Sequence, residues 1–168
     1  MPLKAEKIYL VGFMGAGKTT LAKALAKRLD WQAVDIDELI ETRERAAVAE
    51  IFARQGESYF RAAERSVLAD QLGKPHVVVA TGGGTFVDVQ NRAAILRDGL
   101  AVWLDVPLER LVDRIPADGR RPLAADRSGF ERLYHQRRTA YEQAHLRLDA
   151  GRAGVDALVE QLVDWLGA

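Results

Sequence analysis

The segment Gly12–Thr20 reads G-F-M-G-A-G-K-T-T and directly follows the apolar run Ile8–Val11. The spacing G-x-x-x-x-G-K-[ST] lets several backbone N–H groups point into one concavity, because glycine tolerates backbone angles and close approaches that a Cβ would prevent. In such a loop Lys18 reaches the β and γ phosphates, and Thr19 offers its hydroxyl to Mg²⁺. A helix beginning near Lys18 adds the positive end of its dipole. The pattern predicts a site for a nucleotide polyphosphate.

The alternative interpretation of this loop is an ordinary glycine-rich turn between a strand and a helix. The surroundings favour the phosphate site, since the residues before the loop are apolar and the run Leu21–Leu29 after it is rich in good helix formers. A strand, the glycine loop and a helix in this order are the setting in which the motif binds phosphate.

Two carboxylates, Asp35 and Asp37, follow the second apolar run. If the strand continued through Ile36, their side chains would point to opposite sides, one toward the phosphates and one toward a second ligand. Phosphoryl transfer needs a carboxylate that helps place the metal and another that orients or deprotonates the attacking hydroxyl. The alternative is structural, with Asp35 ending the strand and Asp37 capping a helix that starts at Glu38. The upstream phosphate motif favours the catalytic interpretation.

Three consecutive glycines, Gly82, Gly83 and Gly84, follow the third apolar run. They leave three N–H groups unobstructed and cost conformational entropy that an ordinary turn would avoid. We therefore expect a ligand to lie flat against them. A tight strand-to-helix turn is the alternative.

Arginines are concentrated in the second half of this neutral chain, which has 24 basic and 24 acidic residues. Guanidinium groups suit carboxylate and phosphate, whose oxygens they hold in pairs. Those after residue 100 that draw attention are Arg114, Arg120, Arg121, Arg137 and Arg138. A solvated helix face is the alternative for the last two.

An earlier segment, residues 56–64, reads G-E-S-Y-F-R-A-A-E. Ser58 is a candidate helix cap, and Arg61 and Glu64 would share a face of that helix. A surface ion pair is the alternative role for these two charged residues.

Composition excludes several classes of function. The cancelling charges give no global field for nucleic acid or an anionic membrane. Cysteine is absent, which removes disulfides, thiolate nucleophiles and Cys-based zinc sites. His76, His135 and His145 show no metal-ligand spacing, and we expect them to be structural. No signal peptide or membrane-spanning run is visible, so the expectation is a cytoplasmic protein.

The elements that must position these residues follow from alternating patterns. Short apolar runs lie at residues 8–11, 31–36, 76–80 and 100–104, with a weak run at 146–148, and helical patterns separate them. Such alternation predicts an α/β fold with a mostly parallel sheet, in which ligands bind outside the carboxyl ends of the strands. The length fits one domain over residues 1–168. The stretch Ala117–Ser128, poor in large apolar residues, predicts a mobile loop, with the whole lid at about 114–128.

Taken together, these motifs resemble the shikimate kinase family. The segments that carry the resemblance, over nearly the whole chain, are G-F-M-G-A-G-K-T (12–19), D-I-D (35–37), G-E-S-Y-F-R-A-A-E (56–64), T-G-G-G (81–84), N-R (91–92) and R-R-P-L (120–123). The resemblance implies a three-layer P-loop kinase fold whose central five-stranded parallel sheet has the order 2-3-1-4-5 and is flanked by helices. It also implies ATP- and Mg²⁺-dependent phosphorylation of the 3-hydroxyl of shikimate, on the chorismate route to aromatic amino acids.

On the nucleotide side, the resemblance assigns the phosphates to the loop residues Gly15, Ala16, Gly17, Lys18, Thr19 and Thr20. Thr19 would ligate Mg²⁺, and Asp35 would hold that metal through water. Arg121 would reach from the lid toward the transferring phosphoryl group, and Arg114 would lie near the base or phosphates. The segment expected to pack on adenine, residues 151–154, lacks a distinctive pattern, and Arg152 is its one candidate.

On the acceptor side, the resemblance implies that Asp37 binds the hydroxyls of shikimate and acts as base or orienting group. Arg61 and Arg137 would clamp the substrate carboxylate, with Glu64 supporting Arg61, and residues 82–84 would line the ring. The family commonly shows R-x-P-L-Y where this chain has R-R-T-A-Y at 137–141. Arg137 is preferred over Arg138 only by its spacing from Tyr141, so Arg138 stays an alternative.

Other kinases and nucleotide-binding proteins are alternatives to this function. Gluconate, nucleoside and adenylate kinases share the phosphate loop and an arginine-bearing lid, but not T-G-G-G together with D-I-D; a gluconate-type kinase is the nearest alternative. A GTPase would need N-K-x-D, which is absent, and a dinucleotide-binding fold would need a third glycine. A non-catalytic nucleotide-binding protein would tolerate loss of Lys18, Asp37 or Arg121, and all three are present. We expect ATP and shikimate as the ligands, no nucleic acid or membrane partner, and a monomer.

Overall fold

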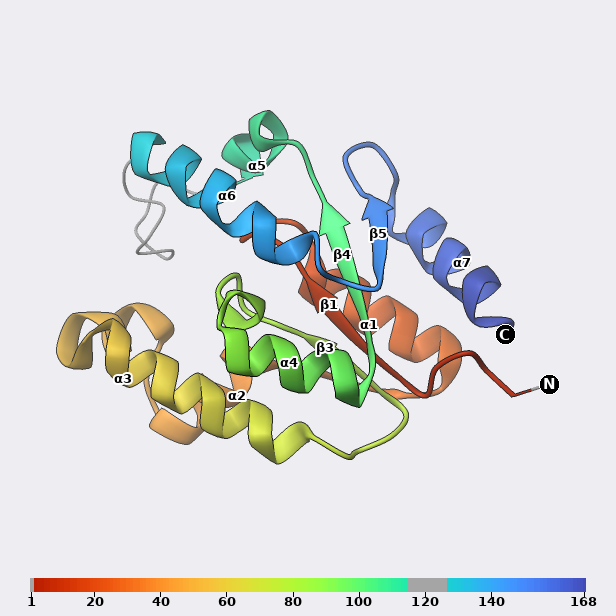
Figure 1. The fold of residues 1–168 in the computed structure, drawn as a ribbon, viewed down its shortest axis with the longest axis horizontal. Coiled ribbons are helices and arrows are strands. Elements are labelled where there is room, and N and C mark those ends of the chain that lie inside the picture. Colours follow the sequence, from red (N-terminus) through yellow and green to blue (C-terminus); the bar gives the residue numbers. More distant parts are fainter. Residues whose placement is uncertain (1, 115–126) are drawn as a thin grey trace.

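The structure, a computed structural model, describes residues 2–114 and 127–168. At its centre lies a parallel five-stranded sheet in the order β2-β3-β1-β4-β5, which confirms the expected class and strand order (Figure 1). The strands are β1 (Lys7–Val11), β2 (Gln32–Asp35), β3 (Val77–Ala80), β4 (Leu100–Asp105) and β5 (Leu146–Asp149).

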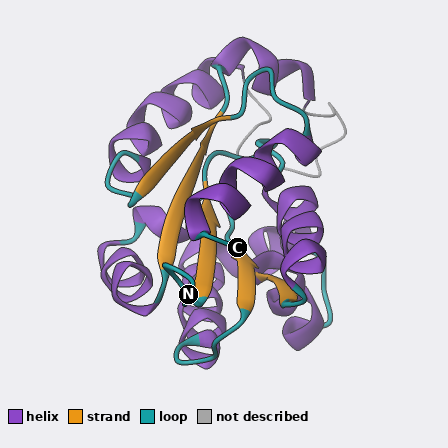
Figure 2. Ribbon diagram, turned by 90° about the vertical axis from the view of Figure 1, so that its right-hand side faces the viewer, coloured by secondary structure: helices purple, strands orange, loops and turns teal. Residues whose placement is uncertain are grey.

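Helices lie on both faces of this sheet, which gives three layers (Figure 2). The helical elements are α1 (Lys18–Leu29), α2 (Ile36–Glu44), α3 (Val48–Gln71), η1 (Thr85–Val87), α4 (Val89–Asp98), α5 (Leu108–Arg114), α6 (Arg127–Tyr141) and α7 (Val155–Leu166). Within the described residues, no helix is both long enough and apolar enough to cross a bilayer.

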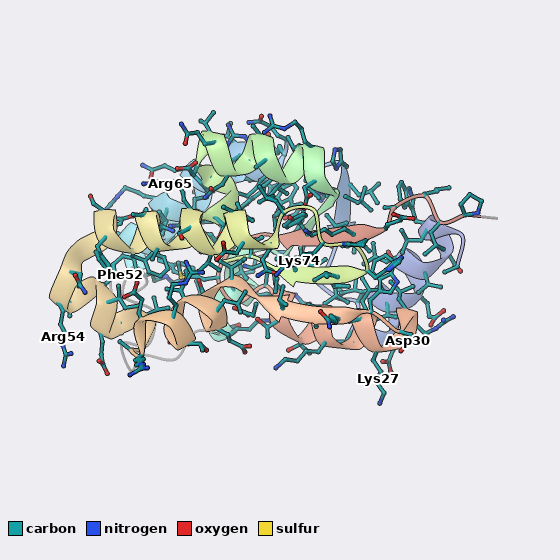
Figure 3. All side chains as sticks on the ribbon, turned by 90° about the horizontal axis from the view of Figure 1, so that it is seen from below. Lys27, Asp30, Phe52, Arg54, Arg65 and Lys74 are labelled. Atoms are coloured by element: carbon teal, nitrogen blue, oxygen red, sulfur yellow. The ribbon has the colours of Figure 1, made fainter. Side chains whose placement is uncertain are left out.

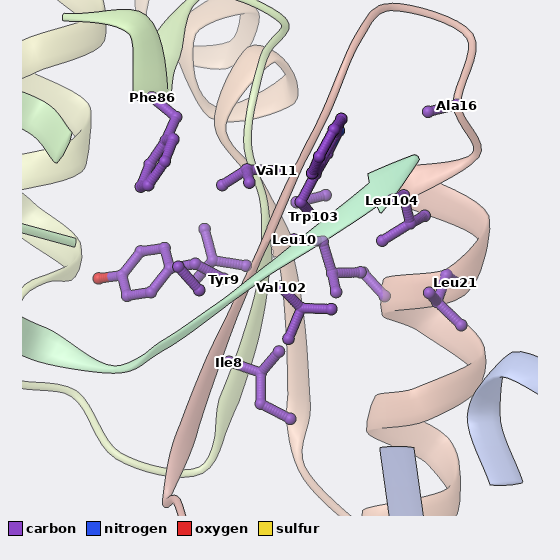
Figure 4. Packing of buried hydrophobic residues seen from close by; sticks show 14 of the residues in the cluster. Ile8, Tyr9, Leu10, Val11, Ala16, Leu21, Phe86, Val102, Trp103 and Leu104 are labelled. Carbon is purple, nitrogen blue, oxygen red and sulfur yellow. The ribbon is translucent and has the colours of Figure 1, made fainter. Parts of the chain in front are cut away.

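The core explains why the central strands are continuous apolar runs rather than alternating ones. Every residue of β1, β3 and β4 is buried, because helices cover both faces of a parallel sheet. On β1, Tyr9 points to the side occupied by Phe86 of η1, whereas Leu10 points toward Leu21 of α1 (Figure 4). The rigid strand β1 leads directly into the phosphate loop and sets its position.

Helix α3 is interrupted at Gly56, two residues before the helix cap that was predicted at Ser58. Gly56 has φ 84° and ψ 171°, values outside the helical region, and the helix resumes after it. Glycine adopts such angles without a Cβ clash, so the break occurs at Gly56, and Ser58 is inside the helix instead of capping it. Figure 3 places Phe52 and Arg54 of α3 at one end of the molecule and Lys27 and Asp30, at the end of α1, at the other.

The predicted strand 31–36 is also too long. It ends at Asp35, whose Oδ1 accepts a hydrogen bond of 3.0 Å from the Glu38 N–H and caps α2. The condition for Asp35 and Asp37 to alternate along a strand is therefore not met, since Asp37 lies in the first turn of α2. The cap of this helix is therefore Asp35 and not Asp37.

The predicted lid lies mostly outside the described residues, and so does Arg121. At its edges the structure is helical: Arg114 ends α5, and Arg127 and Ser128 begin α6. The predicted loop therefore extends too far, because its last two residues, Arg127 and Ser128, are helical.

At the amino ends of the strands a charged cluster holds the fold together. Lys7 is 4% exposed, and its Nζ lies 2.5 Å from Asp98 Oδ2, which also accepts a 2.5 Å hydrogen bond from the Tyr9 hydroxyl. The Gly73 N–H donates to Asp98 Oδ1 at 2.8 Å. Burial alone would raise the pKa of Asp98, but the hydrogen bonds from Lys7, Tyr9 and Gly73 outweigh it and lower the pKa below 3.8.

Candidate active site

The phosphate loop requires glycine at three positions for two different reasons. Gly12, Gly15 and Gly17 have φ values of 149°, 83° and 99°, in the region that disfavours a side chain. A Cβ at Gly12 would in addition lie 2.9 Å from the Leu104 carbonyl oxygen of β4. The loop is therefore packed closely against the end of β4.

Lys18 is folded over this loop. Its side chain is 8% exposed, and Nζ donates to the carbonyl oxygens of Gly12 at 2.6 Å and Phe13 at 2.9 Å. On the outer side of the loop, Arg114 Nη1 donates to the Gly15 carbonyl oxygen at 3.2 Å. Two cations thus flank the concavity, in agreement with a polyanionic ligand.

Thr19 and Asp35 form the pair expected at a metal. The Thr19 hydroxyl donates to Asp35 Oδ2, while Oδ1 of the same carboxylate is held by the Glu38 N–H. Among the described residues no group of three or more His, Cys, Asp or Glu side chains could hold a metal. A hydroxyl and one carboxylate fit Mg²⁺, which keeps its waters and takes phosphate oxygens in place of a full protein cage.

The three glycines after β3 face three different functional side chains. A Cβ at Gly82 would lie 2.7 Å from Asp37 Oδ1, and one at Gly83 would lie 2.9 Å from Arg137 Nη1. At Gly84 the nearest atom would be Arg61 Nη1, only 2.5 Å away. Residues from α2, α6 and α3 therefore converge on one short turn, and any side chain on that turn would displace them.

Arg61 is oriented by two carboxylates of very different exposure. Its Nη1 lies 3.1 Å from Oε1 and 3.2 Å from Oε2 of Glu64, which is 1% exposed. Its Nη2 lies 3.4 Å from Glu57 Oε1, and the Glu57 side chain is 57% exposed. Glu64 therefore holds the guanidinium, whereas Glu57 contacts it from the solvent side and contributes little.

Arg137 is the second guanidinium at the glycine turn, and it is buried, at 6% exposed. Its pKa is lowered, chiefly by burial and further by the neighbouring charge of Arg61, while Tyr141 and Glu64 act in the opposite direction. The Tyr141 hydroxyl donates to the Gly83 carbonyl oxygen at 2.5 Å, and burial raises its pKa. Two guanidinium groups close to a single buried carboxylate leave a net positive charge, which suits an anionic ligand.

The adjacent Arg138 has a different environment. Its Nη1 lies 3.0 Å from Asp105 Oδ1 and 3.1 Å from the Tyr134 hydroxyl, and its guanidinium stacks 4.7 Å from the centre of the Trp103 ring. Asp105 also accepts from Arg147 Nε at 2.7 Å. Arg138 is thus engaged at the end of β4, away from the glycine turn.

A cavity of about 330 Å³ lies beside the glycine turn, between α3 and α6. Its lining includes Glu57, Arg61, Gly84, Val87, Asp88, Leu133, Gln136 and Arg137. Five of these were not predicted as site residues from the sequence: Glu57, Val87, Asp88, Leu133 and Gln136. Asp88 caps α4 through the Asn91 N–H, at 2.9 Å, and the others have no sequence signal, because only the packing of α3, η1 and α6 brings them together at the cavity.

Two of the predicted site residues, Thr20 and Arg152, are exposed in the structure. Thr20 is exposed on the first turn of α1. Arg152 is exposed in the turn after β5, at the same edge of the sheet as the phosphate loop. Their assignments remain predictions.

The fold and the site together define a class of protein. A strand, a G-x-x-x-x-G-K-T loop and a helix on a 2-3-1-4-5 parallel sheet, with a threonine and an aspartate paired beside the loop, make this chain a P-loop kinase. Such an enzyme is an ATP-dependent phosphotransferase.

Comparison with known proteins identifies the family. The family model described as shikimate kinase matches residues 14–167. The shikimate kinase of Persephonella marina is 42% identical over 144 residues, covering 85% of this chain and 88% of the relative, and that of a Sulfurihydrogenibium species is 38% identical, covering 94% and 96%. A solved shikimate kinase from Acinetobacter baumannii in complex with shikimate has a TM-score of 0.90 and 32% identity, over 96% of this chain and 92% of the other. This chain belongs to the shikimate kinase family.

Proposed function

We propose that this kinase transfers the γ-phosphoryl group of ATP to the 3-hydroxyl of shikimate, with Mg²⁺, giving shikimate 3-phosphate and ADP. The observation that carries the proposal is the glycine turn, where Gly82, Gly83 and Gly84 each face one functional side chain, Asp37, Arg137 and Arg61. One acidic and two basic groups around a surface without side chains suit a flat ring with hydroxyls at one end and a carboxylate at the other.

The carboxylate of the acceptor pairs with Arg61 and Arg137 in this proposal. Both guanidinium groups lie at the glycine turn and share one nearby buried carboxylate, Glu64, which is hydrogen-bonded to Arg61. A substrate carboxylate would neutralise the remaining positive charge and accept paired hydrogen bonds. Arginines already held by neighbouring groups, as Arg61 is by Glu64, spend little further entropy on binding.

The reacting hydroxyl is oriented by Asp37. This carboxylate lies in the first turn of α2, next to Gly82 and two residues after the metal-side carboxylate Asp35. A carboxylate within hydrogen-bond reach of an alcohol can orient it and accept its proton as the new O–P bond forms. The proton would thus pass from the 3-hydroxyl to Asp37 Oδ1 or Oδ2.

The nucleotide side uses the phosphate loop. The amides of residues 15–20 would hold the phosphates, and Lys18, now bonded to the carbonyl oxygens of Gly12 and Phe13, lies where it can turn its charge toward them. Thr19 and Asp35 would hold Mg²⁺, directly and through water, and Mg²⁺ when bound supplies neutralisation of the β and γ phosphate charge. Arg114, over the loop at Gly15, is assigned to the nucleotide, as are Arg121 and Arg152 on the family resemblance.

The proposal treats the chain as one domain that works as a monomer. The assigned residues that the structure describes surround one sheet, which supports a single domain. A cytoplasmic location, where ATP is available, belongs to the same proposal.

A charge-deleted substrate tests the carboxylate clamp. We expect the wild-type enzyme to show a KM for shikimate methyl ester about 10- to 100-fold higher than for shikimate, because the ester lacks a charge-assisted, paired contact. Arg61→Ala should bring the two KM values together by weakening shikimate alone. Arg54→Ala is the matched control, since Arg54 lies on the same helix with its side chain 77% exposed.

The outcomes separate clearly in steady-state kinetics with ATP held saturating. Equal KM values for acid and ester in the wild-type enzyme would contradict the clamp. Retention of the full preference in Arg61→Ala would show that other groups hold the carboxylate.

A further inference from the structure

Thr85, the first residue of η1, is fully buried and its hydroxyl makes two hydrogen bonds. Oγ1 accepts from the Gly82 N–H at 2.9 Å and donates to Glu64 Oε2 at 2.8 Å. A hydroxyl has one proton to donate, and an ionised carboxylate can only accept, so the direction of both bonds follows. The side chain therefore joins the glycine turn to the carboxylate behind Arg61.

The turn and the carboxylate are linked from both directions. The Thr85 N–H donates to the Gly82 carbonyl oxygen at 3.2 Å, so Gly82 and Thr85 bond reciprocally and close the turn. On the other side, Oε2 of Glu64 accepts from the Thr85 hydroxyl and also lies 3.2 Å from Arg61 Nη1. The chain of contacts runs from Gly82 through Thr85 and Glu64 to Arg61, and its two inner residues, Thr85 and Glu64, are both buried.

This chain of contacts spans both ends of the proposed acceptor site. Gly82 is the glycine that faces Asp37, and Arg61 is the guanidinium that faces Gly84. Thr85 itself lines no part of the cavity beside α3 and α6. It can influence the acceptor only through the groups that it holds.

We propose that Thr85 is a positioning residue for the acceptor carboxylate: its hydroxyl fixes the rotamer of Glu64, and through Glu64 the guanidinium of Arg61. The inference rests on the proposed role of Arg61 as carboxylate clamp. Glu64 has two oxygens and Arg61 touches both, so a carboxylate free to rotate would present the guanidinium in several orientations. The hydrogen bond from Thr85 selects one of them, which spares the substrate the cost of ordering the clamp.

The alternative is that Thr85 merely fills space behind the turn. Valine separates the two roles, because it has nearly the same shape and lacks the hydroxyl. In Thr85→Val the Gly82 N–H and Glu64 Oε2 would each lose a buried partner, whereas in Thr85→Ser both bonds can form and only a methyl group is removed. A hydrogen-bonding role predicts that serine works and valine does not, and a filling role predicts the reverse.

The test compares Thr85→Val, Thr85→Ser and Arg61→Ala by steady-state kinetics, with thermal unfolding as a check of the fold. We expect Thr85→Val to raise KM for shikimate about tenfold and to leave KM for ATP unchanged, as for the loss of one buried hydrogen bond. Thr85→Ser should stay within about twofold of the wild-type enzyme. Arg61→Ala should raise KM for shikimate at least as much as Thr85→Val.

A second comparison shows whether Thr85 acts through Glu64. In a Glu64→Gln background, Thr85→Val should add little, because the orientation that the hydroxyl secures is already lost. If Thr85→Val is poorly folded, Thr85→Ala replaces it in this double-mutant cycle.

The outcomes distinguish the inference from the function on which it rests. Normal shikimate KM in Thr85→Val, equal effects on shikimate and ATP, failure of serine to restore binding, or full additivity with Glu64→Gln would overturn the role of Thr85. If Arg61→Ala also leaves the shikimate KM unchanged, the proposed role of Arg61 as carboxylate clamp fails, which is a different outcome from failure of the role of Thr85.

Discussion

The two halves of the active site are built in opposite ways. The phosphate loop is one continuous segment, residues 12–20, and it acts mainly through main-chain groups after a single buried strand. The acceptor side draws on four elements, α2, α3, the turn before η1, and α6, and it acts through side chains. A local main-chain site tolerates change around it, whereas a site made of distant side chains depends on how helices pack.

This difference between the two halves indicates which of them selects the acceptor. Backbone amides and a lysine recognise any nucleotide polyphosphate, so the loop by itself indicates only a P-loop enzyme. In the proposed function the choice of acceptor depends on Asp37, Arg61 and Arg137, which no local pattern joins. Substitutions on the acceptor side should therefore change shikimate kinetics and spare ATP.

Asp37→Asn should produce the largest effect. Orienting or proton-accepting groups typically contribute about 10²- to 10⁴-fold to turnover, so we expect kcat to fall within that range while ATP binding, measured by calorimetry, is unchanged. Glu38→Gln is the neighbouring control, since Glu38 has a side chain 60% exposed. Near-normal turnover in Asp37→Asn would refute its role.

Adjacent arginines on α6 offer a second test. Arg137→Ala should raise KM for shikimate about 10- to 100-fold by removing a charge-assisted contact. Arg138→Ala should leave that KM close to the wild-type value, because Arg138 pairs with Asp105 and stacks on Trp103. If Arg138→Ala is the variant that weakens shikimate, the assignment of the two arginines is wrong.

A single methyl group tests the close packing at the glycine turn. A Cβ at Gly84 would meet Arg61 Nη1 at 2.5 Å, although the backbone, with φ −101°, accepts alanine. The guanidinium must then shift, and we expect Gly84→Ala to raise KM for shikimate several-fold, on the order of the cost of one misplaced hydrogen bond. Gly154→Ala, where nothing lies within 4 Å of the new Cβ, is the control. Equal kinetics in both variants would mean that Arg61 need not lie against the turn.

The smallest kinetic effect is expected at the other end of the sheet. Asp98→Asn should leave both KM values unchanged and lower the free energy of unfolding at neutral pH by about 1–3 kcal/mol, because the ionised Asp98 accepts bonds from Lys7, Tyr9 and Gly73.

The pH dependence of that difference has a definite sign. The pKa of Asp98 is lower in the folded chain than its unfolded value of 3.8, so its stabilisation is present above 3.8 and is lost as the pH falls through the folded pKa. Denaturant unfolding of wild type and Asp98→Asn should show a gap that closes below pH 3.8. A constant gap would assign the stabilisation to packing instead of charge.

The sequence predicted the parts of the molecule that depend on neighbouring residues. The apolar run 8–11, the glycine loop and the helix after it are contiguous, so the phosphate site and the parallel sheet followed from local pattern alone. The positions of Arg61, Arg137 and the glycine turn relative to one another came only from family resemblance, since Arg61 and Arg137 are far apart in the chain and both contact the turn only in the folded structure.

The failures have the same physical origin. Asp35, rather than Asp37, caps α2, because the strand turns into the helix one residue earlier than its apolar pattern indicates. Gly56 and not Ser58 marks the break in α3, because a positive φ outweighs a capping preference there. Thr85 gave no signal, since its hydroxyl binds Gly82 and Glu64, and the second partner lies 21 residues away.

The most direct measurement is ATP consumption in a coupled assay with shikimate, gluconate and nucleosides supplied in turn. A phosphate loop together with a glycine turn bordered by Asp37, Arg61 and Arg137 predicts saturable turnover with shikimate and only background rates with the others. Brisk ATP consumption with gluconate or an uncharged nucleoside, and none with shikimate, would contradict the account.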